Sequence, residues 1–231
     1  MRWTAVLMAA AGVAGVARAA EVDCAEVHGG KAAATCEVVP CGPTFEPFLG
    51  EWRGPFEEYV QGLSKPDAPV LRPYDDRIRY AAQDCLRERA SGDVFIVGRR
   101  EDRYPAFGML AAKVARGLLV SGRHADGSAF LRTVDEEGVH DYALESRDAA
   151  TQSATWRLDV PAGRRPCPGP AEPEKTCAMP AMAFRIVDGR DPAAAAGEVR
   201  RVEIDMTVGP AAAPYWQGVL VRGHHERHAL P

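Results

Sequence analysis

A period-two alternation of apolar and polar residues constrains the fold of this chain most. Residues 201–208 show it clearly, because an apolar residue follows each polar one along the whole run, and residues 151–160 and 182–186 repeat it. Strands are also expected over residues 93–100, 117–124, 129–135, 139–146 and 215–224. Alternation of this kind gives each strand one buried face. The links are short, and residues 125–128 contain the hairpin dipeptide Asp126-Gly127. The pattern therefore predicts a mainly β protein, an antiparallel barrel or a sandwich.

The first half of the chain is less regular. A short helical turn is expected at residues 48–49, followed by a strand over residues 51–59, and residues 62–73 should form a loop because they contain three prolines. Residues 74–90 fit two interpretations: Ile78, Ala82 and Cys85 share a helical face, whereas Ile78, Tyr80 and Ala82 alternate as in a strand. Residues 105–116 are predicted to form a short helix, since Met109, Leu110 and Val114 have helical spacing and Gly117 would cap it.

The N-terminus has the order of a secretory signal. Arg2 lies before an apolar run over residues 5–16, and Ala17-Arg18-Ala19 supplies small residues for a signal peptidase. This run is shorter than the roughly 20 residues that a membrane-spanning helix needs. We therefore expect cleavage after Ala19, with residues 1–19 as the signal, residues 20–43 as a cysteine-rich arm and residues 44–231 as a single β-rich domain. A periplasmic or secreted protein without a membrane span is expected.

All six cysteines follow the predicted cleavage site. An even number of cysteines in an exported chain is typical of disulfides, here three. The sequence contains no Cys-x-x-Cys pair, which a zinc site would favour. Cys167 and Cys177 are the best-supported pair because they flank a proline-rich loop that cannot hold itself by burial. The pairing of the other four stays open. The six residues are Cys24, Cys36, Cys41, Cys85, Cys167 and Cys177.

The charge of the chain disfavours nucleic acid as a partner. The formal net charge is −4, and removal of Arg2 and Arg18 with the signal would make it about −6. Arg99-Arg100 is a local basic pair, but Glu101-Asp102 follows at once, so we interpret this segment as a solvated charged turn.

Two short segments resemble signatures of the lipocalin-like, or calycin, barrels. Phe48-Leu49-Gly50-Glu51-Trp52 is similar to the first signature of that family, in which Gly-x-Trp opens strand one, and His140-Asp141-Tyr142 is similar to the second. The resemblance implies a barrel for small apolar ligands, with Trp52 at one end and Arg222 stacked on its indole. Trp52, Trp156, Trp216 and Arg222 are therefore the candidate ligand contacts, although the three tryptophans also suit ordinary core or rim positions.

Three histidines near the C-terminus are the candidate metal ligands. His224, His225 and His228 carry imidazoles that bind zinc or copper. A stable site needs three or four ligands in fixed geometry, and strand alternation would put His224 and His225 on opposite faces. We therefore expect no metal site and no cofactor. The segment from Gly50 to Gly54 also resembles the start of nitrobindin, a haem-binding barrel, and haem binding would require one of these histidines inside the barrel.

Evidence for an enzyme is weaker. Ser121, Ser128 and Ser146 lie in expected strands or turns, and none belongs to a Gly-x-Ser-x-Gly motif. His124 and His140 could approach each other across the meander, near Asp141 or Glu145, as a general base would require. An outward-facing polar pair explains the same residues without catalysis.

Three functions follow in order of preference. The first is an exported binding protein whose barrel holds a small apolar ligand. The second is a structural or interaction protein of the bacterial envelope with a filled barrel. The third is an enzyme of unspecified type. An apolar cavity would favour the first function, a packed interior the second, and a cleft with clustered His, Asp and Glu residues the third.

Overall fold

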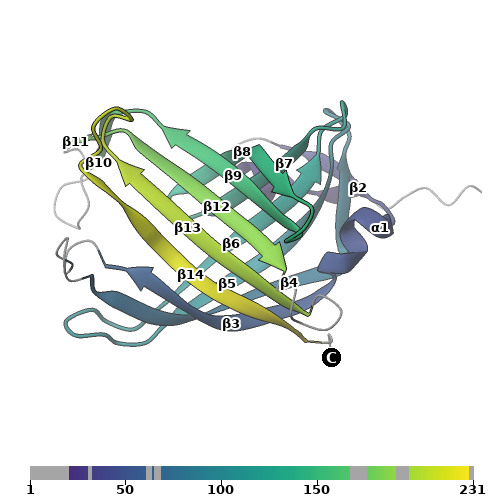
Figure 1. Ribbon diagram of the computed structural model, residues 1–231. Helices are drawn as coiled ribbons and strands as arrows, with labels where there is room; N and C mark the ends of the chain where they lie inside the picture. The colour runs from purple at the N-terminus through teal and green to yellow at the C-terminus, as the bar shows by residue number, and fades with distance from the viewer. Residues whose placement is uncertain are drawn as a thin grey trace, which may run out of the picture.

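The computed structural model describes residues 21–30, 33–60, 64, 69–166, 176–190 and 198–228. The predicted signal and Cys167 lie outside these residues. Strands dominate the described chain (Figure 1). They are β1 (Glu21–Asp23), β2 (Thr35–Val38), β3 (Gly50–Tyr59), β4 (Leu71–Glu88), β5 (Val94–Tyr104), β6 (Lys113–Arg123), β7 (Ala129–Asp135), β8 (Gly138–Asp148), β9 (Ser153–Val160), β10 (Gly163–Pro166), β11 (Thr176–Met179), β12 (Met182–Arg190), β13 (Val199–Val208) and β14 (Trp216–His228).

Ten of the described strands close into an antiparallel barrel. The order around it is β3-β14-β13-β12-β9-β8-β7-β6-β5-β4, and β4 pairs with both β3 and β5. The mainly β, antiparallel barrel prediction is therefore confirmed. The hairpin of β10 and β11 lies at one end of the barrel, and α1 (Gly42–Phe45) lies at the other (Figure 1).

Short helices cover the α1 end. The helix α1 continues into a 3-10 helix, η2 (Glu46–Phe48), which leads directly into β3. Another 3-10 helix, η1 (Ala25–His28), belongs to the N-terminal arm. Among the described residues, no helix combines the length and apolar character that crossing a bilayer requires.

The N-terminal arm packs on the outside of the barrel. Strand β2 pairs with the last residues of β4, and β1 pairs with β2. Val27 and Leu86 pack there against Phe95 and Val97, which β5 turns away from the barrel interior. The arm therefore buries an apolar outer patch that would otherwise face solvent.

Two disulfides attach the arm and α1 to this structure. Cys24 is bonded to Cys36 within the arm, and Cys41, just before α1, is bonded to Cys85 on β4. Cys177 is also disulfide-bonded. The other member of its predicted pair, Cys167, lies outside the described residues.

Three local sequence interpretations are settled by the structure. Residues 74–88 belong to the long strand β4 rather than to a helix, and residues 89–90 begin the turn that follows it. The helix predicted over residues 105–116 is wrong, because Gly108 has a left-handed φ of 57° and Lys113 already begins β6. Arg99 and Arg100 lie within β5 rather than in a turn.

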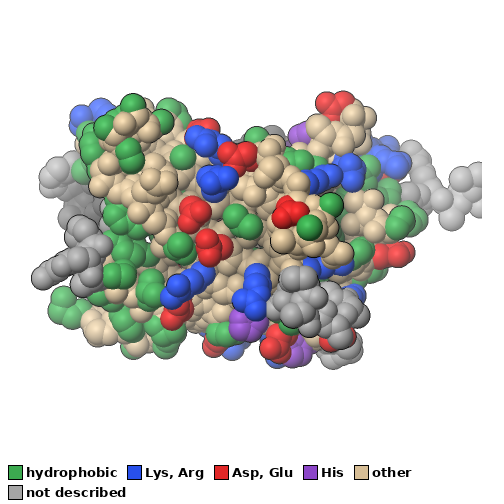
Figure 2. All heavy atoms as spheres, viewed as in Figure 1, with side chains coloured by type: hydrophobic (Ala, Val, Ile, Leu, Met, Phe, Trp, Pro, Cys, Tyr) green, Lys and Arg blue, Asp and Glu red, His purple; other side chains and the backbone are tan. Residues whose placement is uncertain are grey.

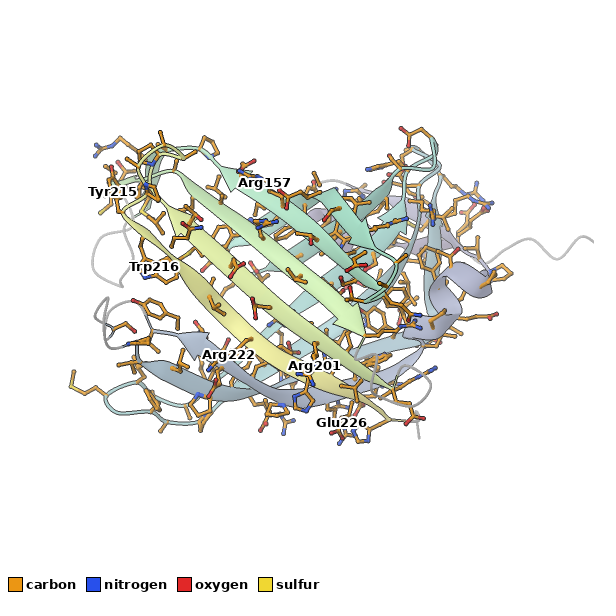
Figure 3. The ribbon with its side chains drawn as sticks, in the orientation of Figure 1. Arg157, Arg201, Tyr215, Trp216, Arg222 and Glu226 are labelled. Atoms are coloured by element: carbon orange, nitrogen blue, oxygen red, sulfur yellow. A yellow bond between two sulfur atoms is a disulfide. The ribbon has the colours of Figure 1, made fainter. Side chains whose placement is uncertain are left out.

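The outer face of β9, β12, β13 and β14 is charged. Positive and negative side chains are interspersed over it (Figure 2). Arg157 contacts Asp159 at 2.8 Å, and Arg222 contacts Glu57 at 3.0 Å. Arg157 and Arg222 both lie on this outer side in Figure 3, whereas Tyr215 lies at the β10–β11 end.

Candidate functional site

The barrel interior contains an unusual group of buried charges. Alternation along β4 directs Tyr74, Asp76, Ile78 and Tyr80 inward, and all four are buried. Asp76 lies directly opposite Asp102 on the neighbouring strand β5. Two carboxyl groups therefore face the same space inside the barrel, where charges need partners to be tolerated.

Arg100 joins the two carboxyl groups. Its Nε donates to Oδ2 of Asp76 at 3.1 Å, and its Nη2 lies 2.9 Å from Oδ2 of Asp102. Oδ1 of each aspartate is buried without a hydrogen-bond partner in the described structure. One guanidinium thus pairs with two carboxyl groups and leaves each with an open acceptor position.

The two aspartates have pKa values shifted in opposite directions. Burial raises the pKa of Asp102 to about 7, because desolvation outweighs the attraction of Arg100. Burial also acts to raise the pKa of Asp76, but Arg100 and His225 lower it below its usual range. Near neutral pH, Asp76 is ionised while Asp102 can hold a proton.

His225 completes this group from β14. Its side chain is almost fully buried, its ring centroid lies 4.7 Å from that of Phe56, and its Nε2 lies 3.6 Å from Oδ1 of Asp76. Burial lowers the pKa of His225 more than Asp76 raises it, and the cations Arg200 and Arg100 lower it further. The imidazole is therefore neutral at neutral pH.

A glycine on β3 leaves space for this imidazole next to β14. Gly54 on β3 lies beside β14, and a Cβ atom at Gly54 would lie only 1.6 Å from the backbone oxygen of His224. The glycine lets the two backbones approach and leaves its inward position empty beside His225.

A second ion pair lies deeper in the barrel. Arg200 on β13 is paired with Asp188 on β12, and its side chain is only 7 % exposed. The hydroxyl of Tyr80 interacts with Arg200, and the Phe48 ring centroid lies 5.8 Å from the guanidinium carbon. Asp188 offsets the charge that Arg200 brings into the interior.

These charged groups border a hollow, which we name the interior chamber. Its volume is about 220 Å³, and most of its wall is apolar. Asp76, Arg100, Asp188, Arg200 and His225 line it, and Asp135, Glu137 and His140 of the β7–β8 hairpin also belong to its wall. The apolar wall includes Phe56, Leu119, Leu131, Leu158, Val160, Met182, Phe184, Ile186, Val202, Ile204 and Val221. A molecule inside would meet a mainly apolar surface interrupted by these polar side chains.

The predicted tryptophans lie in different places. Trp52 and Trp156 are buried and both line a second hollow of about 500 Å³, which we name the α1-end hollow. Its wall also contains Phe45, Phe48, Phe130, Arg123, Arg147, Asp148, Asp188, Arg190 and Arg200. Trp216 instead stacks on Tyr59 with ring centroids 4.9 Å apart, near Tyr215 at the opposite end (Figure 3).

The arginine predicted to stack on Trp52 was the wrong one. Arg222 points outward and pairs with Glu57. Arg227 lies with its guanidinium carbon 5.9 Å from the Trp52 ring centroid, and it donates to the Leu49 carbonyl at 2.7 Å. The indole Nε1 of Trp52 donates to the Phe48 carbonyl at 2.8 Å, so the ring is fixed at the start of β3.

The three C-terminal histidines do not converge. The strand β14 extends to His228 because residues 226–228 pair with β3, so this segment is not frayed. As predicted, adjacent residues alternate: His225 is buried, whereas His224 is exposed by 41 %. Among the described residues, no group of three or more His, Cys, Asp or Glu side chains is arranged to hold a metal ion.

A haem does not fit these two hollows. His225 lines the interior chamber, but its volume of about 220 Å³ is below the roughly 300–1,000 Å³ of pockets for drug-sized molecules. The α1-end hollow is larger, but its described lining contains no histidine. As the described residues line them, neither of these two hollows therefore offers a haem site of the kind that the resemblance to nitrobindin suggested.

His124 and His140, the two histidines considered as a general base, do not approach each other. His124 contacts Asp93 at 2.9 Å near one end of β7, whereas His140 pairs in register with Thr133 and lines the interior chamber. Neither ring nitrogen of His225 has a hydrogen-bond partner in the described structure. A nucleophile activated by an adjacent base needs such contact, so the described residues do not form one around His225.

Sequence reasoning missed Asp76, Arg100 and Asp102. Their signal was present, because Asp76 alternates with the apolar residues Ile78 and Tyr80 in the strand interpretation of residues 74–90. It was not decisive while that segment also fitted a helix. Arg100 and Asp102 were hidden by the assumption that consecutive charges form a solvated turn.

Comparisons with known proteins identify no family. No family model matches the chain. A segment of 58 residues is 47% identical to the Lon protease of Mycolicibacterium smegmatis, and it covers 25% of this chain but 7% of that protein. The crystal structure of Rv2717c from M. tuberculosis aligns over 83% of this chain and 99% of its own, with 13% identity and a TM-score of 0.38. Neither likeness assigns a function.

Proposed function

We propose that this chain is an exported, disulfide-bonded binding protein whose barrel holds a small, mainly apolar molecule with one polar group. The observation that carries this proposal is the interior chamber, because most of its wall is apolar and a smaller set of polar side chains, Arg100, Asp76 and His225 among them, completes it. Ligand sites commonly combine such walls with a few placed polar groups. The alternative, a structural protein with a filled barrel, agrees less well with the presence of this hollow.

The size of the chamber limits the ligand. An apolar cavity of about 150 Å³ can hold benzene, and the chamber has a volume of about 220 Å³. It therefore suits a molecule somewhat larger than benzene and smaller than most drugs. A short aliphatic alcohol or a monocyclic terpenoid has this size and polarity.

The polar group of the ligand would meet Arg100. This side chain lines the chamber and remains 29 % exposed, whereas Asp76 and His225 are almost fully buried behind it. A hydroxyl or carbonyl oxygen could accept a hydrogen bond from the guanidinium without breaking its pairs with the aspartates. The ligand need not be charged, because the two carboxyl groups already balance Arg100.

Export and a lipocalin-like assignment are parts of the same proposal. The bonds Cys24–Cys36 and Cys41–Cys85 favour an oxidising compartment such as the periplasm or the extracellular space. The closed barrel and the placement of Trp52 beneath Arg227 support the lipocalin-like assignment.

Filling the chamber tests the binding function. The variant V202W places an indole in the chamber, and V187W places one on the outer face of β12 as a matched control. Isothermal titration with 1-octanol should show binding to the wild type and V187W and at least a tenfold loss with V202W. I204F provides a second filling variant if V202W does not fold. Equal binding by the wild type and a folded filling variant would contradict the proposal.

A further inference from the structure

The α1-end hollow differs in charge from the interior chamber. Four arginines and two aspartates line it, so the side chains of its wall carry an excess of two positive charges. Asp188 is paired with Arg200, and Asp148 accepts hydrogen bonds from the backbone N–H groups of Ala150 and Thr151. Within the described residues, neither carboxylate forms an ion pair with the remaining arginines.

Of the three remaining arginines, Arg123 donates a hydrogen bond to the Gly127 carbonyl at 3.2 Å, which leaves Arg147 and Arg190. Within the described residues, neither guanidinium group forms an ion pair or a hydrogen bond, although both residues line the hollow. Arg190 lies directly across from Arg200 in the pairing of β12 with β13. Arg147 reaches the hollow from the end of β8. Guanidinium groups without a carboxylate partner are suited to bind an anion, and a planar carboxylate can be held in a bidentate geometry.

The apolar part of this hollow is aromatic. Trp52 is 3% exposed and Trp156 is 8% exposed, so both rings are fixed by packing, and Phe45 and Phe48 add to the wall. Rigid aromatic side chains offer flat contact surface at a low entropic cost. The hollow thus combines flat apolar walls with unpaired positive charge.

We propose that the α1-end hollow binds a small aromatic carboxylate, with its ring between the aromatic side chains and its carboxylate facing Arg147 and Arg190. This site adjoins the interior chamber, because Leu131, Asp188 and Arg200 line both hollows, but of the two only the α1-end hollow is lined by Trp52, Trp156, Arg147 and Arg190. The two sites therefore have different ligand chemistry: an anion at the α1 end and a neutral, mainly apolar molecule inside.

The test compares 2-naphthoate with its uncharged analogue 2-naphthamide. Quenching of tryptophan fluorescence should report binding, because Trp52 and Trp156 line the hollow. We expect 2-naphthoate to bind at least tenfold more tightly than the amide at low salt. R147Q and R190Q should each weaken naphthoate binding by about threefold to tenfold and leave binding of the amide unchanged. The control R222Q, on the outer face, should change neither.

Three results would overturn the proposal: no binding of naphthoate at millimolar concentration, equal binding of naphthoate and naphthamide, or an equal effect of R147Q, R190Q and R222Q. The last result would mean that only the overall charge matters. The V202W variant separates this site from the proposed function, since it should abolish 1-octanol binding and leave naphthoate binding within twofold of the wild type. Loss of naphthoate binding in folded V202W would also contradict two separate sites.

Discussion

Asp102 is the residue whose protonation most affects the barrel interior. Burial next to Asp76 raises its pKa from the usual range of an aspartate to about 7. An acid with a higher pKa in the folded state binds more protons when folded. Its contribution to stability is therefore fully present at low pH and is lost as the pH rises from about 4 through 7.

The variant D102N should remove this dependence. Between pH 5 and pH 8, the free energy of unfolding of D102N should increase relative to the wild type by about 2–3 kcal/mol. Urea denaturation at both pH values measures the difference. The control D159N changes an exposed carboxylate whose pKa is lowered by Arg157, so its difference from the wild type should not change over this range. A constant difference for D102N would show that Asp102 is ionised in the fold throughout.

Trp52 is buried at the α1 end of the barrel, and its indole Nε1 donates a hydrogen bond to the Phe48 carbonyl. Trp52→Ala should lower the free energy of unfolding by about 3–5 kcal/mol, because it removes a buried ring and leaves a cavity. Trp216→Ala should cost less, since Trp216 is only partly buried. Chemical denaturation checks both variants, and a loss below about 1 kcal/mol for Trp52→Ala would contradict the buried position.

At the level of elements, alternation predicted the regular strands well. Strands β7, β8, β9, β12 and β13 lie close to their expected residues, because each has one face in the interior and one in solvent. The wrong prediction of a helix over residues 105–116 has a different physical origin. The apolar residues at 105–116 had helical spacing by coincidence, and the pairing of Lys113 with Tyr104 across β5 and β6 decided the structure.

The candidate site was less predictable than the fold. A charged residue that points inward, such as Arg100 or Asp76, looks in sequence like a charged residue that points outward. Only pairing across strands reveals that Asp76 faces Asp102 and that His225 lies near both. The choice of Arg222 rather than Arg227 as the partner of Trp52 failed for the same reason, because strand register was unknown.

The two described disulfides should differ in their effect on stability. Cys41–Cys85 closes a sequence separation of 44 residues, and Cys24–Cys36 closes one of 12. If constraint of the unfolded chain dominates, replacing both cysteines of the pair with serine should cost about 4 kcal/mol for the first bond and about 3 kcal/mol for the second. Denaturation of the two double variants measures this order. A larger loss for Cys24–Cys36 would mean that the arm contributes mainly through packing on Phe95 and Val97.

At the scale of the whole molecule, the barrel is closed but not filled. The arm buries the outer apolar patch, the outer strands carry a mixed charged surface, and the interior keeps an apolar chamber beside buried charges. A barrel with a purely structural role would gain stability from filling such a space. The hollow interior is therefore the feature that a binding function explains best.

The most direct test of this account locates a bound molecule by nuclear magnetic resonance. Protein with labelled methyl groups is mixed with 1-octanol, and contacts between the two are measured by intermolecular nuclear Overhauser effects. The account predicts contacts to Val202, Ile204 and Val221, which line the interior chamber. Contacts confined to Met109 and Val114, which are 94% and 52% exposed, would place the alcohol on the surface and contradict a binding function for the barrel interior.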